Sequence, residues 1–116
     1  MDLVKLQNAG IDVEDGLRRF MKSEQMFEKF LKKFLDNDLY AAFQKEADTP
    51  DATAEQLFER AHALKGVCAN LSMTGIIEVL GPMVETLRAG ALTGVREQMP
   101  ELDKRYQMVV SVIREL

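Results

Sequence analysis

The sequence has few of the residues that build most enzymatic and metal sites. It contains one histidine, one cysteine and no tryptophan among 116 residues. A single cysteine, Cys68, excludes an internal disulfide and agrees with a reducing compartment. One imidazole and one thiol do not make a metal site, and the Glu-x-x-His spacing of metal-binding helical bundles is missing. Glycine-rich phosphate loops and kinase nucleotide motifs are also missing, so we do not expect independent catalysis.

Acidic residues outnumber basic residues in this sequence. The chain has 15 Lys and Arg against 19 Asp and Glu, which gives a formal net charge of −4. Nucleic-acid binding is not expected, because a phosphate backbone requires a basic face. No apolar run approaches the roughly 18 residues of a membrane span, and the first residues, MDLVKLQNAG, lack the order of a signal peptide. We therefore expect a cytoplasmic monomer without membrane contact.

Helical periodicity is the strongest signal that the sequence does contain. Hydrophobic residues make up 47% of the chain, and they recur at steps of three and four without any strand-like alternation. Four long amphipathic segments joined by short links predict an all-α fold, an antiparallel up-and-down four-helix bundle. We expect one domain, in which residues 23–116 form the bundle and short helices within residues 1–22 cover one of its ends.

Helix boundaries can be predicted from capping residues and prolines. Ser23 is a good N-cap, and Thr53 with Gln56 fits a capping box. Asn37 and Asp38 leave open whether the first bundle segment is one bent helix or two. Pro82 predicts a kink near Glu78 to Pro82, and Pro100 either kinks the last helix or begins it.

The only histidine, His62, lies near the middle of the stretch from Thr53 to Gly75, TAEQLFERAHALKGVCANLSMTG. On a helix with about 100° per residue, His62 points about 140° away from Leu57. It is therefore expected to face away from the core, where a partner can reach it. The predicted buried stripe of this helix consists of Leu57, Ala61, Leu64, Cys68 and Leu71. We interpret Cys68 as a packing residue, since a buried thiol is inert.

Lys65 and Gly66 follow His62 by one turn on the same side of the helix. Glycine inside a helix costs about 1 kcal/mol relative to alanine, and the periodicity gives no reason for a break here. We interpret Gly66 as part of a flat surface without side chains beside His62, and this surface lets a partner's backbone approach the imidazole. Lys65 supplies a mobile ammonium suited to a phosphate on the ring. The further residues predicted to contact a partner are Phe58, Glu59 and Ala69.

The segment AHALKG followed by NL resembles the histidine phosphotransfer (HPt) domains of multistep two-component relays. These are helical bundles in which a histidine, in a pattern close to H-x-L-K-G, carries a phosphoryl group between receiver-domain aspartates. The stretch IDVEDGLRRF also looks like the entry to such domains. Two positions depart from the pattern, because Ser72 stands where glycine is frequent and Cys68 where alanine or serine is usual. Neither departure touches the histidine chemistry.

The resemblance implies a phosphocarrier without kinase activity of its own. His62 would accept the phosphoryl group through Nε2 from a receiver's aspartyl phosphate and pass it to a second receiver. Lys65 would stabilise the phosphate, and Gly66 would give the partner access. The implied partners are response-regulator receiver domains, a hybrid sensor histidine kinase, or both. The receiver would bring Mg²⁺, while this chain would need no cofactor.

An alternative from another class is a helical adaptor, a degenerate relay domain that binds the same partners through the same face without being phosphorylated. The presence of His62, Lys65 and Gly66 together argues against it, since a protein that only binds has no reason to keep all three.

Overall fold

The computed structural model describes residues 1–116, and all of its regular structure is helical. This confirms the predicted all-α class. The elements in chain order are α1 (Leu3–Asn8), α2 (Val13–Arg19), α3 (Glu24–Phe34), α4 (Leu39–Ala47), α5 (Ala54–Asn70), α6 (Thr74–Arg88), the 3₁₀ turn η1 (Arg96–Gln98) and α7 (Met99–Arg114).

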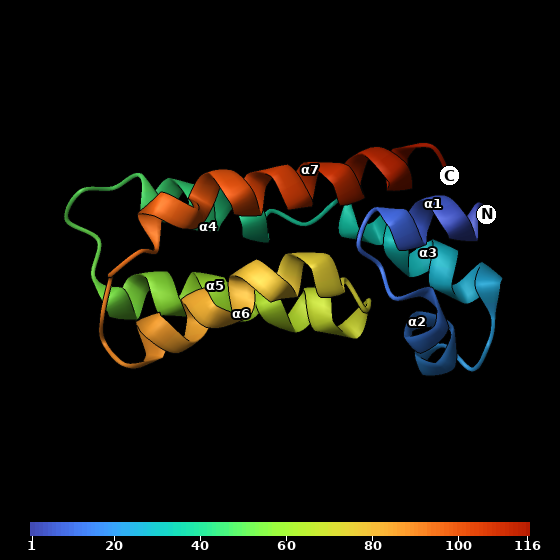
Figure 1. Cartoon of the computed structure of the whole chain (residues 1–116), viewed down its shortest axis with the longest axis horizontal. Coiled ribbons are helices and arrows are strands. Elements are labelled where there is room, and N and C mark those ends of the chain that lie inside the picture. Colours follow the sequence, from blue (N-terminus) through green and yellow to red (C-terminus); the bar gives the residue numbers. More distant parts are fainter.

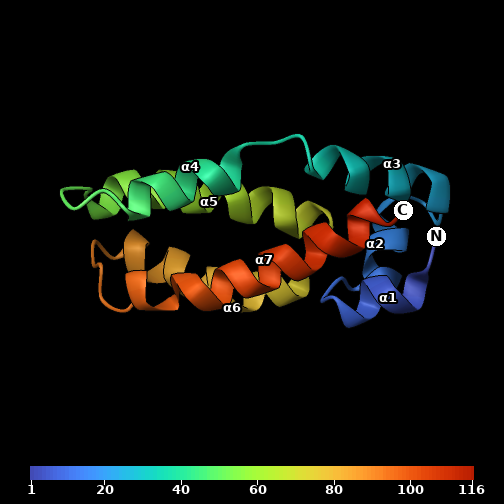
Figure 2. The same ribbon diagram turned by 90° about the horizontal axis from the view of Figure 1, so that it is seen from above.

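The long helices form a four-sided antiparallel bundle (Figures 1 and 2). In Figure 1, α4 and α7 lie above α5 and α6, whereas in Figure 2 α4 and α5 lie on one side and α6 and α7 on the other. Each helix therefore packs against its neighbours in chain order, most extensively α5 against α6. Because α7 lies diagonally across from α5, one long face of α5 points to solvent.

The first side of the bundle is built from two helices, α3 and α4, which follow each other along one edge (Figure 2). Asn37 separates them. Its side-chain amide donates to the Phe34 carbonyl at 2.6 Å, and its side-chain oxygen accepts from the Leu39 backbone N–H at 3.0 Å. Asn37 thus satisfies backbone groups at the end of one helix and the start of the next, which answers the question that the sequence left open.

The predicted helix starts are confirmed. The Ser23 hydroxyl accepts from the Met26 N–H at 3.1 Å, and Thr53 and Gln56 form both bonds of a capping box at 3.2 and 2.9 Å. Pro100 lies in the first turn of α7, so it begins that helix. Helix α6 continues from Thr74 to Arg88 with Pro82 inside it.

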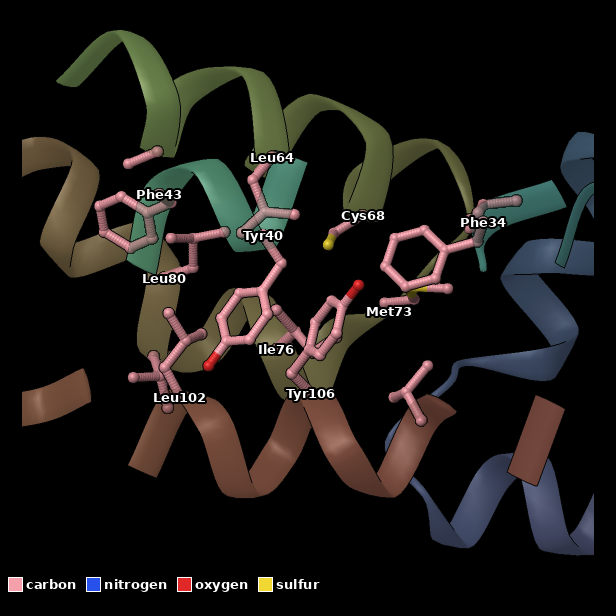
Figure 3. Close-up of a cluster of buried hydrophobic side chains, with 14 of the residues drawn as sticks. Phe34, Tyr40, Phe43, Leu64, Cys68, Met73, Ile76, Leu80, Leu102 and Tyr106 are labelled. Carbon is pink, nitrogen blue, oxygen red and sulfur yellow. The ribbon is translucent and has the colours of Figure 1, made fainter. Parts of the chain in front are cut away.

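One hydrophobic core of 28 buried residues runs through the molecule. Figure 3 shows its middle, where side chains from α4, α5, α6 and α7 meet. The rings of Tyr40 on α4 and Tyr106 on α7 stack with centroids 3.9 Å apart. The Tyr40 hydroxyl donates to Asp103 at 2.7 Å. Burial, followed by this bond to a carboxylate, raises the pKa of Tyr40, so the phenol stays protonated.

The N-terminal helices cover the end of the bundle at which α5 turns into α6 (Figure 1). Leu6 and Ile11 are fully buried there and belong to the same core. The Gly75 N–H donates to the Gly10 carbonyl at 2.9 Å, and the Ser72 hydroxyl donates to Asp15 at 2.7 Å. These bonds fix the N-terminal segment to the turn that follows α5.

Candidate functional site

Helix α5 has one buried and one exposed face, and His62 lies on the exposed one. Leu57, Ala61, Leu64 and Cys68 are all fully buried on the opposite side. The predicted orientation of the histidine is therefore confirmed. Burial raises the pKa of the Cys68 thiol to about 12, which keeps it protonated and a poor nucleophile.

The surface beside His62 is open on the side of Gly66. Gly66 is exposed, and a Cβ built on it would meet no atom within 4 Å. No packing contact therefore requires a glycine at this position. Lys65 is half-buried and forms no ion pair. Its ammonium group is not occupied by a neighbouring carboxylate, and Ala69, one turn further along, is half-buried.

An aromatic ring lies against the imidazole on the other side. The rings of Phe58 and His62 stack with centroids 5.3 Å apart and planes inclined by 18°. This is the offset-stacked arrangement that aromatic pairs favour, and such pairs stabilise by about 0.5–1.5 kcal/mol beyond area burial. Phe58, which we expected to touch a partner, thus contacts the histidine of its own helix. Glu59 is exposed and forms no ion pair.

Arg88, at the end of α6, is a site residue that the sequence analysis missed. Its guanidinium carbon lies 4.9 Å from the centroid of the Phe58 ring, and its Nε lies 3.4 Å from Glu85. A cation over an aromatic face at an exposed site is worth about 0.5–1 kcal/mol. One signal could have found this pair, because Phe58 and Arg88 are equidistant in sequence from Met73 in the turn between antiparallel helices.

No group of three or more His, Cys, Asp or Glu side chains is arranged to hold a metal ion. None of the helices combines the length and the apolar character needed to cross a membrane.

Comparison with known proteins identifies one match. A family model described as Hpt domain matches residues 25–111, which is most of the chain and includes His62, Phe58 and Arg88. Comparisons with curated proteins and with solved structures give no match.

Proposed function

Because the chain belongs to the Hpt domain family, whose members are histidine phosphotransfer carriers of phosphorelays, we propose that His62 is its phosphoryl acceptor. The donor is an aspartyl phosphate on a receiver domain, and a second receiver takes the group. One observation carries the proposal: the only histidine lies exposed on α5, inside the matched residues, while the opposite face of that helix is buried.

The chemistry requires a neutral imidazole aligned with the phosphorus atom. The Nε2 lone pair forms the N–P bond while the P–O bond to the aspartyl carboxylate breaks, and the carboxylate departs with that electron pair. The proton on Nδ1 stays on the ring. In the reverse direction a receiver carboxylate attacks phosphorus, and Nε2 recovers its electron pair. Phosphoryl transfer depends mainly on alignment and charge neutralisation, so an exposed, well-held ring suffices on this side of the complex.

The neighbours of His62 support this role. Lys65 has no carboxylate partner, so its ammonium is free to approach a phosphoryl oxygen as a point charge. The open space at Gly66 lets the rim of a receiver come close to the ring. We propose that the receiver contributes Mg²⁺ and that the two proteins meet in the cytoplasm. The direct contacts of the receiver would include Glu59 and Ala69.

The decisive experiment incubates the protein with a phosphorylated receiver and follows the label. We expect acid-labile phosphate on the wild type and none on His62→Gln. Because the side chain is exposed, this substitution should lower the free energy of unfolding by no more than about 1.5 kcal/mol, the value of the lost stack with Phe58. Lys65→Ala should remain folded but accept and release phosphate more slowly, since it loses the local cation.

The adaptor alternative makes a different prediction for the same experiment. A wild-type protein that binds the receiver with measurable affinity, yet never acquires phosphate, would contradict phosphotransfer and establish the adaptor. A His62→Gln protein that is still labelled would place the acceptor on another residue.

A further inference from the structure

We propose that Phe58 is a positioning residue for phosphoryl transfer. Its ring fixes the plane of the His62 imidazole, and Arg88 of the neighbouring helix α6 holds Phe58 in place. This inference rests on the proposed function of His62 and adds a feature that the motif around the histidine does not contain.

The side chain of an exposed histidine is free to rotate. The imidazole turns about two side-chain bonds, and nothing in solvent selects one orientation. The stack with Phe58, at 5.3 Å and 18°, restricts the ring to planes nearly parallel to the phenyl ring. The nucleophilic lone pair of Nε2 lies in the plane of the imidazole, so fixing the plane confines the approach of a phosphorus atom to directions within that plane.

The Phe58 ring is contacted from a second helix. Phe58 is half-buried on the same helix as His62, and a stack between two side chains of one helix could turn as a pair. Arg88 opposes this rotation, because its side chain, although 52% exposed, reaches the Phe58 ring from α6 with its guanidinium carbon 4.9 Å from the centroid. Arg88 is in turn paired with Glu85 at 3.4 Å. The orientation of the imidazole is thereby tied to two helices.

The alignment of the imidazole affects the rate of phosphoryl transfer. In-line transfer is faster when the nucleophile is aligned before the partner docks, and a small misplacement of the nucleophile lowers the rate by a large factor. Loss of the Phe58 ring should therefore lower the rate of the chemical step. It should have little effect on the affinity for a receiver, which meets a much wider surface.

A small phosphodonor separates the alignment of the imidazole from its reactivity. Phosphoramidate can phosphorylate histidine directly and has no docking surface, so it meets the imidazole in any orientation and its rate reports only the reactivity and accessibility of the ring. We expect Phe58→Leu to leave phosphorylation by phosphoramidate within about twofold of the wild-type rate, because an untethered donor needs no fixed ring plane. With a phosphorylated receiver, the maximal transfer rate should fall roughly tenfold while KM changes less than about twofold. Phe58→Tyr keeps an aromatic ring and should recover most of the rate.

A matched control removes an aromatic ring elsewhere. Phe30 on α3 is also partly exposed and stacks on Phe20 with centroids 5.3 Å apart. Phe30→Leu should leave the maximal transfer rate from the receiver unchanged. If Phe30→Leu and Phe58→Leu lower it equally, the effect is general destabilisation and the positioning role is wrong.

The role of Arg88 is tested by a double-mutant cycle. If Arg88 acts through Phe58, Arg88→Gln lowers the maximal transfer rate from the receiver in the wild type but has no further effect in Phe58→Leu. If the two effects multiply, Arg88 acts independently of Phe58, and its assignment as the support of Phe58 is overturned.

A spectroscopic readout checks the stack without any phosphate. His62 is the only histidine, so its two ring C–H resonances in a proton NMR spectrum are assigned directly. Both should be shifted by the Phe58 ring current and should return toward ordinary values in Phe58→Leu. Unchanged shifts would show that the rings do not stack in solution.

Failure of this inference can be told apart from failure of the proposed function. A wild type that is phosphorylated on His62, with Phe58→Leu equally fast, contradicts only the positioning role. A wild type in which His62 is never phosphorylated contradicts the proposed function, and the NMR shifts still report whether the stack exists.

Discussion

At the scale of single residues, Ser72 shows how a departure from the HPt pattern is accommodated. Its φ is +55°, a left-handed conformation that glycine adopts without steric strain and that strains other residues. The side chain is buried, and its hydroxyl donates to Asp15 at 2.7 Å. A serine at this position has a strained backbone but makes a hydrogen bond that glycine cannot make. This bond joins α2 to the turn after α5.

A pair of substitutions separates the two contributions of Ser72. Ser72→Ala keeps the strained backbone and loses the bond to Asp15, so we expect a loss of about 1–2 kcal/mol in the free energy of unfolding. Ser72→Gly loses the same bond but relieves about 1 kcal/mol of left-handed strain, so it should be the more stable variant. Urea unfolding of both proteins measures the difference. An alanine variant as stable as the glycine variant would contradict the strain argument.

At the scale of the helices, the same residue type has opposite roles in α2 and α5. Gly16 of α2 lies under the buried ring of Phe27, and a Cβ on it would come within 2.4 Å of the Phe27 Cζ atom. Gly66 of α5 faces open space. The first glycine is required by packing between α2 and α3, whereas the second is free of packing and needs a functional explanation.

Alanine at each position tests this distinction. Gly16→Ala should destabilise the protein by about 1–3 kcal/mol, because Phe27 has to move in a filled core. Gly66→Ala should stabilise it by up to about 1 kcal/mol through helix propensity. Thermal melts of the two variants give the comparison. A loss of stability in Gly66→Ala would mean that the open space beside it is filled in solution.

Gly66→Gln extends the test from stability to function. Its longer side chain should keep much of the helical gain but project beside His62, so transfer from a receiver should weaken through a higher KM. Phosphoramidate, which needs no docking, should react at the wild-type rate. A normal KM for the receiver would contradict the interpretation of Gly66 as the floor of a docking surface.

At the scale of the whole molecule, the N-terminal helices and the bundle share one hydrophobic core. They are also joined by a polar clamp, in which Asp15 accepts hydrogen bonds from Arg18, Arg19 and Ser72. Hydrogen bonds from Arg19, then Arg18 and Ser72, lower the pKa of Asp15 far below its ordinary value of 3.8. A carboxylate whose pKa is lowered by folding stabilises the folded state above its unfolded pKa. That contribution is lost as the pH falls toward the folded value.

Acid should therefore weaken the clamp and lower the stability of the whole protein. The melting temperature of the wild type should fall as the pH is lowered below about 4, and the fall should be smaller in Asp15→Asn. Other carboxylates also titrate in this range, so the quantity to measure is the difference between the two proteins. If that difference is the same at neutral pH and at about pH 3, the ionised state of Asp15 does not support the fold.

The sequence alone determined the features that depend on neighbours along the chain. Apolar residues at steps of three and four define the buried faces of the helices, so the periodicity around Leu57 and Leu64 was enough to place His62 on the exposed side. Caps such as Thr53 with Gln56 are local hydrogen bonds, and they fixed where α5 begins. The residues around His62 also carried the family resemblance, because that motif is a continuous stretch.

Only the tertiary structure decided which faces meet. The contact of Arg88 with Phe58, the bond between Ser72 and Asp15, and the close approach of Gly16 to Phe27 all join different helices. Each depends on the register and rotation of two packed helices, and these are set by the summed packing of the core. The hydrophobic pattern of a helix predicts which of its faces is buried, but it does not predict how far that face lies from a second helix. The surroundings of His62 beyond its own helix therefore became visible only when α6 was packed against α5.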